Sequence, residues 1–150
     1  MKNYFKNKKG FTLIELLIVI GIMVVLMAAA LVAINPFRQF AQANDANRWS
    51  GITTIMDAIY QNVVDNRGTF DCVAAIPASS TVMASGAGNY DICSCLVSTY
   101  VGALPIDPQT GSYTDCSSYN TKYEIERDTS TGRIKIAAPD AQLGAVQITR

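Results

Sequence analysis

Residues 9–34 of the 150-residue chain read KGFTLIELLIVIGIMVVLMAAALVAI, and they govern how the rest of the chain is organised. From Leu16 to Ile34, nineteen residues carry neither a charge nor a polar side chain. As a helix with a rise of about 1.5 Å per residue, this run spans roughly 28 Å, close to the thickness of a bilayer core. Residues 1–10, MKNYFKNKKG, contain four lysines and no acid. The positive-inside rule predicts one membrane crossing, with this end in the cytoplasm and the remainder exported.

The composition excludes several classes of function. The chain has no histidine, which rules out zinc sites built on imidazole and catalysis by Ser-His-Asp or Cys-His groups. Its 12 basic and 12 acidic residues balance, which provides no basic surface for a phosphate backbone, and we predict no direct nucleic-acid binding. Because the carboxylates are scattered and no histidine is present to activate Ser, Thr or Lys, we predict that the protein is not an enzyme.

Three interpretations of the N-terminus compete. The first is a removable secretory signal, for which Ala28-Ala29-Ala30 satisfies the A-x-A cleavage pattern. The second is a plain signal anchor. The third depends on Glu15, a carboxylate in an otherwise apolar helix, which costs about 2.5 to 3.5 kcal/mol if it reaches the middle of the membrane. Such a charge indicates a partner, unless Glu15 only starts the helix at the interface, where the helix dipole favours an acid.

The stretch from Lys9 to Leu17, KGFTLIELL, closely resembles the class III signal of bacterial type IV pilins and type II secretion pseudopilins. The resemblance implies that a membrane-embedded prepilin peptidase cuts between Gly10 and Phe11 and methylates the new amine of Phe11. It also assigns Glu15 to the glutamate of that family. The implied fold is α+β and pilin-like, with one long N-terminal α-helix, a membrane half plus an amphipathic half, packed on a small antiparallel β-sheet after a long αβ loop.

The physical consequences of such a cut agree with the resemblance. Cleavage removes four lysines and no acid, so 8 basic and 12 acidic side chains remain, a charge of −4. It also creates an amine at Phe11, four residues from Glu15 and on the same helix face. In a filament, the amine of one subunit is expected to neutralise Glu15 of a neighbour inside an apolar core, where an unpaired carboxylate is costly.

The pattern beyond the membrane run predicts an amphipathic helical continuation over residues 35–67. Asn35-Pro36 is expected to interrupt the helix, and Asn66-Arg67-Gly68 is expected to end it. Charged residues, among them Asp45 and Arg48, take positions outside the apolar pattern, whose segment from Ile52 to Val63 is predicted to pack on the exported half. The apolar pattern comprises Phe37, Phe40, Ala41, Trp49, Ile52, Ile55, Met56, Ile59, Tyr60 and Val63.

Residues 68–150 are predicted to form the exported, loop-rich domain. Residues 69–89 are rich in Ala, Ser, Thr and Gly and indicate a long surface connection, and residues 91–102 favour a short helix. Period-two stretches at 119–127, 133–138 and 144–149 predict an antiparallel sheet. The segment Leu104-Pro105-Ile106-Asp107-Pro108, with the Gly and Tyr residues after it, resembles the major pseudopilin of type II secretion more loosely.

The four cysteines, Cys72, Cys93, Cys95 and Cys116, all fall in the predicted exported part. An oxidising compartment favours two disulfides, paired either 72–93 with 95–116 or 72–95 with 93–116, and the sequence does not choose between them. A Cys-x-Cys redox site is disfavoured because no Lys or Arg lies nearby in the sequence to lower a thiol pKa.

A calcium site is the one cofactor that the sequence suggests. Asp107, Gln109 and Asp115 offer oxygen ligands, and the type II secretion relatives carry calcium in a nearby loop. A solvated turn explains the same residues, and the pattern is not an EF-hand.

The leading functional hypothesis is a filament subunit for secretion, adhesion, motility or DNA uptake. The resemblance implies self-assembly into a helical filament, with prepilin peptidase, an inner-membrane assembly platform and its ATPase as partners and membrane lipid around the helix before assembly. The expected location is the inner membrane, as a single-pass protein, and then a periplasmic or extracellular filament. The alternative is a minor tip pilin or a membrane-anchored module that binds a ligand.

Overall fold

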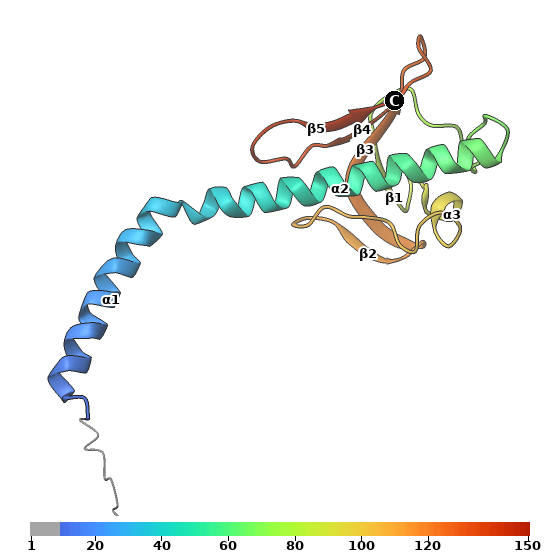
Figure 1. Ribbon diagram of the computed structural model, residues 1–150. Helices are drawn as coiled ribbons and strands as arrows, with labels where there is room; N and C mark the ends of the chain where they lie inside the picture. The colour runs from blue at the N-terminus through green and yellow to red at the C-terminus, as the bar shows by residue number, and fades with distance from the viewer. Residues whose placement is uncertain (1–9) are drawn as a thin grey trace, which may run out of the picture. The chain divides into compact units, whose positions relative to one another are not determined.

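The computed structural model describes residues 10–150, which form one unit that ends at Gln39 and a second unit from Phe40 to Arg150 (Figure 1). The predicted leader, residues 1–10, lies outside the described residues except for Gly10. The fold is α+β and pilin-like: a long apolar N-terminal helix, then a second helix and a small antiparallel sheet.

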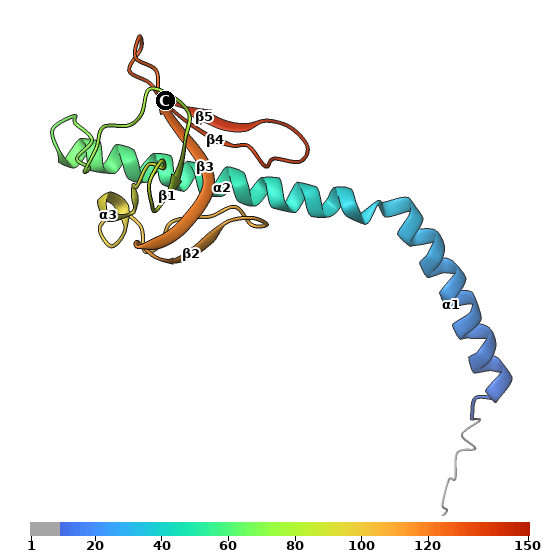
Figure 2. The ribbon, with the colours of Figure 1, turned by 180° about the vertical axis from the view of Figure 1, so that it is seen from behind.

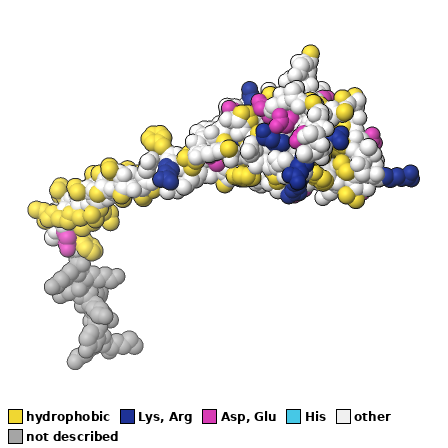
Figure 3. All heavy atoms as spheres, turned by 90° about the horizontal axis from the view of Figure 1, so that it is seen from above, with side chains coloured by type: hydrophobic (Ala, Val, Ile, Leu, Met, Phe, Trp, Pro, Cys, Tyr) yellow, Lys and Arg dark blue, Asp and Glu magenta, His cyan; other side chains and the backbone are white. Residues whose placement is uncertain are grey.

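The first unit consists of helix α1, Leu13–Ile34, and the start of helix α2. Thr12 caps α1, because its hydroxyl accepts a hydrogen bond from the Glu15 amide at 3.3 Å. Helix α1 has 22 residues and no buried residue, and a stretch of 18 of its residues has a mean hydropathy of 3.2. It is the one helix within residues 10–150 that is long and apolar enough to cross a membrane. Figure 3 shows the hydrophobic side chains gathered along it.

The predicted interruption at Asn35-Pro36 is confirmed as a boundary between two helices. Asn35 has φ +47°, in the left-handed region, which ends α1. Asparagine tolerates this conformation better than most residues. Helix α2, Pro36–Asp65, then begins on the proline, whose missing N–H and fixed φ suit the first helical position.

In the second unit, α2 packs on a five-stranded antiparallel sheet, as Figures 1 and 2 show from opposite sides. Strand β3, Ser118–Arg127, pairs with β1, Thr81–Ala84, on one side and with β4, Ile134–Ala138, on the other. Strand β5, Val146–Thr149, extends the sheet beyond β4, and β2, Ser112–Asp115, pairs with the first residues of β3.

The core lies between the sheet and one face of α2. Along β3, alternate side chains are buried, among them Tyr123 and Ile125, and Ile125 lies opposite Ile136 of β4. Ile52, Ile55, Met56 and Ile59 of α2 are fully buried in the same cluster. The predicted packing of the segment from Ile52 to Val63 against the exported half is therefore confirmed.

Two sequence predictions about elements need correction, and one strand was not predicted. Residues 69–89 are not all surface connection, because β1 forms within them, and β2 was not predicted at all. Both strands have four residues, too few for a clear alternation, and they form by pairing with β3. The helix predicted over 91–102 shrinks to α3, Cys93–Leu96. In the apolar pattern of α2, Phe37, Phe40 and Trp49 are exposed.

Candidate assembly surfaces and the charge cluster

The predicted processing residues lie at the start of the described chain. Phe11 is 79% exposed, and a Cβ built on Gly10 would meet no atom within 4 Å. Glu15 lies in the first turn of α1, where its carboxylate faces the positive end of the helix dipole. Among the described residues, no atom therefore crowds Gly10, and the side chain of Phe11 is exposed.

Within residues 10–150, the apolar surface of α1 is uncovered. All its large side chains are exposed, and a shallow apolar groove centres on Gly21, where the missing side chain leaves room. The groove is lined by Leu17, Ile18, Gly21, Ile22, Val25 and Leu26. Small residues of this kind allow helices to approach closely in lipid or in a helical core. The apolar helix and the signal at its start fit a membrane-anchored protein.

A buried guanidinium is the main polar feature of the second unit. Arg48 of α2 is fully buried, and its Nε donates to Oδ2 of Asp107 at 2.6 Å while its Nη2 donates to Oδ1 at 3.2 Å. Nη1 donates to Asp45 at 2.9 Å, and Nη2 also donates to Gln109 at 3.1 Å. This fork of donors suits two carboxylates better than a lysine would.

Backbone amides donate further hydrogen bonds to both carboxylates of this cluster. The amides of Gln142 and Leu143 donate to Asp45, the latter at 2.8 Å. The amides of Gln109 and Thr110 donate to Asp107 at 2.9 and 3.0 Å. One arginine therefore connects α2 to the loop before β2 and, through Asp45, to the loop between β4 and β5.

The same contacts set the pKa values in the cluster. Burial alone would raise the pKa of Asp107, but the hydrogen bonds from Arg48 and from the two amides outweigh it, and the pKa lies below its usual value. The pKa of Asp45 is lowered in the same way, against the effect of burial, by the amides of Gln142 and Leu143 and by Arg48. The hydrogen bonds to Asp107 raise the pKa of Arg48 despite its burial. All three groups are therefore charged at neutral pH.

The residues suggested for calcium do not come together. Asp107 and Gln109 both direct oxygens at the Arg48 guanidinium, which holds a positive charge where the cation was expected. Asp115 instead accepts hydrogen bonds from Ser117 and Ser118 in the turn between β2 and β3. Within residues 10–150, no group of three or more Asp, Glu or Cys side chains is arranged to hold a metal ion. The geometry therefore gives the calcium prediction no support.

The sequence reasoning missed the cluster because it treated Asp45 and Arg48 as part of the polar face of the helix. A signal was present, since Arg48, Ile52, Ile55 and Ile59 follow one another at steps of three or four residues and share one face of α2. An arginine on the buried face of a helix requires acidic partners, and this spacing could have prompted a search for them.

The cysteines form two disulfides, and the structure selects the pairing Cys72–Cys95 and Cys93–Cys116. The first joins the loop after α2 to α3, and the second joins α3 to the turn after β2. No cysteine is left free for redox chemistry.

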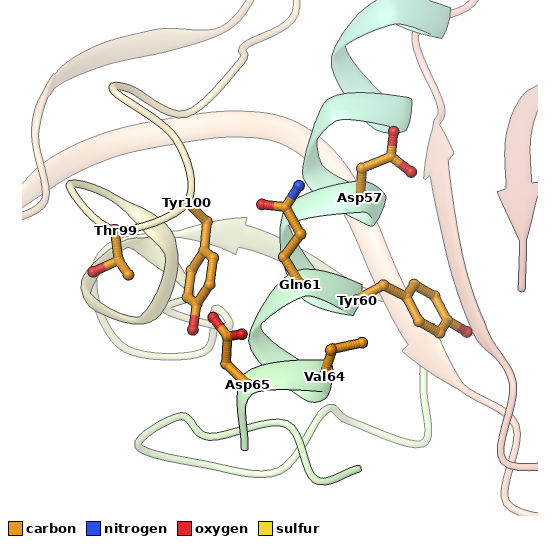
Figure 4. Close-up of a pocket in the computed structure, with 7 residues that line it drawn as sticks. All are labelled: Asp57, Tyr60, Gln61, Val64, Asp65, Thr99 and Tyr100. Atoms are coloured by element: carbon orange, nitrogen blue, oxygen red, sulfur yellow. The ribbon is translucent and has the colours of Figure 1, made fainter. Parts of the chain in front are cut away.

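An open groove runs along the C-terminal part of α2, beside the turn that follows α3 (Figure 4). Its floor and walls carry two tyrosines and two carboxylates. The lining residues are Asp57, Tyr60, Gln61, Val64 and Asp65 of α2, together with Thr99 and Tyr100. Burial raises the pKa of the Tyr100 hydroxyl, and the nearby carboxylates of Asp65 and Asp71 raise it further. The groove is therefore electronegative.

Comparison with known proteins bears on the N-terminal segment. No solved structure matches the chain. Residues 5–31 match the family described as the prokaryotic N-terminal methylation motif. The matched segment contains Gly10, Phe11 and Glu15 and most of α1, and it is the segment that closely resembles the pilin signal. The match, together with the long apolar helix, supports a class III signal of the type IV pilin and pseudopilin kind at the N-terminus of this chain.

Proposed function

We propose that this protein is a structural filament subunit of the type IV pilin or pseudopilin kind. One observation carries the proposal: residues 5–31 match the N-terminal methylation motif, and residues 13–31 of that segment belong to an exposed apolar helix with one carboxylate in its first turn. Such a helix needs cover, and lipid provides it before assembly. Copies of the same helix provide it in a filament, where the exposed side chains become the core.

In this proposal, prepilin peptidase cuts between Gly10 and Phe11 and methylates the Phe11 amine. The mature chain then comprises the membrane and filament-core segment 11–34, the amphipathic segment 35–67 and the exported domain 68–150. The N-terminus faces the cytoplasm until an inner-membrane platform and its ATPase move the subunit into a filament. The type IV pilin kind is structural rather than enzymatic in general, which agrees with the absence of histidine from this chain.

Mass spectrometry of the mature chain tests the processing step. We expect an N-terminus at Phe11 that carries one added methyl group, and Gly10→Trp should leave the uncut four-lysine precursor in the membrane because the side chain does not fit a protease cleft shaped for glycine. A mature N-terminus at Leu31, or an intact Met1 in the assembled protein, would contradict the proposal.

A variant of Glu15 tests the assembly step. Replacing Glu15 by Leu removes the charge partner of the neighbouring amine, and filament yield is expected to fall while membrane insertion continues. Glu15→Asp keeps the charge and is the matched control, which we expect to retain part of the yield. Filaments formed at the normal level by Glu15→Leu would contradict this role of the carboxylate.

A few copies of this subunit per filament, counted in purified filaments, would instead favour the tip subunit or binding module.

A further inference from the structure

Arg38 lies four positions beyond the segment 11–34 that is expected to form the filament core. It lies in the first turns of α2 between Phe37 and Phe40, which are 84% and 69% exposed. Among residues 10–150, Arg38 takes part in no salt bridge. If these aromatic side chains are covered on assembly, the guanidinium between them is covered as well, and a buried cation requires a carboxylate. Within the first unit, Glu15 is the only acid among the described residues, and the proposal above assigns it to the Phe11 amine.

The groove on the C-terminal part of α2 offers the opposite charge. Asp57 is already paired with Arg150, at 2.5 Å, but Asp65 takes part in no salt bridge within the described part of the chain. Figure 4 shows the Asp65 carboxylate and the Tyr100 hydroxyl pointing toward each other, while Val64 and the Tyr60 ring project from the other side of the helix. The groove thus combines a carboxylate that has no cationic partner with two aromatic rings and an exposed valine.

We propose that this groove receives Arg38 of a second copy of the chain. The guanidinium pairs with Asp65 and lies against the Tyr100 ring, while the flanking phenylalanines cover Tyr60 and Val64. Of the cations without a salt bridge in residues 10–150, Arg38 is the one that stands between exposed aromatic residues, which is why it fits a groove that is both acidic and aromatic. This inference rests on the proposed filament function.

The contact joins two different surfaces, because Arg38 is at the start of α2 and the groove is near its end. In a head-to-tail arrangement, which a filament requires, each contact leaves the groove of one copy and the Arg38 of the other free, so that further copies can add at both ends.

A charge exchange in the full-length protein tests the pairing. Arg38→Glu and Asp65→Arg are each expected to lower the yield of purified filaments about tenfold, as for loss of a partly desolvated ion pair. The double variant, Arg38→Glu with Asp65→Arg, restores opposite charges across the contact and is expected to recover most of the yield. Arg133→Glu, a reversal of an exposed cation in the β3–β4 connection, is the control and should assemble normally.

Folding of each variant is checked by disulfide formation and by urea unfolding of the membrane-extracted protein, which should not change because Arg38 and Asp65 are exposed. Normal yield from both single variants, or a double variant that folds but stays as impaired as the singles, overturns the pairing. Either result leaves the filament function intact, because that function fails only if the unaltered protein is not processed at Phe11 and forms no filaments.

Discussion

At the scale of single residues, the fold of the second unit depends on a charge at a position of α2 where the helix pattern expects an apolar side chain. Arg48 occupies the buried face of α2 and reaches Asp107, 59 residues away in the sequence, at 2.6 Å. Within the described residues, no buried side-chain nitrogen or oxygen lacks a hydrogen-bond partner, so the cost of burying this ion is compensated by complete pairing. The cluster therefore fixes the position of two loops against the helix.

Truncation of Arg48 tests how much the buried ion cluster contributes to stability. Arg48→Ala leaves two carboxylates without their cation, and we expect a loss of about 3 to 5 kcal/mol in the free energy of unfolding. The control is Arg150→Ala, which breaks the Asp57–Arg150 pair at the surface and should cost at most about 1 kcal/mol. Urea unfolding followed by circular dichroism measures both. Equal losses in the two variants would show that the buried cluster contributes no more than a surface pair.

The same carboxylates predict the response to acid. The pKa values of Asp45 and Asp107 are lower in the folded chain than the ordinary 3.8, so the stability they provide is present above that value. It is lost as the pH falls below 3.8 and through the folded pKa values. The urea midpoint should therefore fall as the pH drops from about 4 to about 2, and Asp107→Asn should flatten this fall. If the urea midpoint of Asp107→Asn fell with pH in parallel to that of the unaltered protein, the role of Asp107 in acid sensitivity would be contradicted.

At the scale of elements, the loop before β2 bends back on itself at Gly111. The Gly111 amide donates to the Asp107 carbonyl at 3.1 Å, which closes a tight turn around the partner of Arg48. A Cβ at Gly111 would lie 2.6 Å from the backbone nitrogen of Asp107 and 2.7 Å from its oxygen. No side chain fits at that distance from main-chain atoms, so the turn requires glycine for space.

Alanine at this position should displace Asp107 and with it the ion cluster. We expect Gly111→Ala to lower the free energy of unfolding by about 1 to 3 kcal/mol. Gly102→Ala is the matched control, because a Cβ there meets nothing within 4 Å, and it should be neutral or stabilise by up to about 1 kcal/mol. Thermal denaturation of the two variants side by side makes the comparison, and similar melting temperatures would refute the packing argument.

At the scale of the whole molecule, the two units differ in how far they bury their apolar side chains. The first exposes a continuous apolar surface, and the second has its own core between α2 and the sheet. Two disulfides reinforce the loop-rich side of that core, each between cysteines 23 positions apart. A domain cross-linked by two disulfides is suited to an oxidising compartment, which is where the second unit is expected to be.

Removing the disulfides one at a time separates two contributions to stability: the entropy of loop closure in the unfolded chain and the packing of the cysteines in the core. Because the two loops have the same length, the entropic contribution should be equal, about 3 kcal/mol each. We expect Cys93→Ala with Cys116→Ala to be the more destabilising pair, because Cys93 is fully buried in the core whereas Cys72 and Cys95 are not. Urea unfolding of both double variants in non-reducing buffer measures the difference, and a greater loss on removing Cys72–Cys95 would contradict the prediction.

The sequence alone determined the features that depend on consecutive residues. The length of the apolar run, the interruption at Asn35-Pro36 and the three alternating strands follow from local hydropathy and backbone preference, and the structure confirms them. The signal around Gly10 and Glu15 could also be recognised from the sequence, because its specificity lies in the spacing of a few neighbouring residues.

Only the tertiary structure decided which distant residues meet. Three features depend on segments that are distant in the sequence and meet only in the folded chain. They are the pairing of the four cysteines, the contact of Asp107 with Arg48 where a calcium ion was considered, and the strands β1 and β2. Such contacts are fixed by the global packing of α2 on the sheet, since a buried charge or a four-residue strand gains stability only from the partner that folding brings to it.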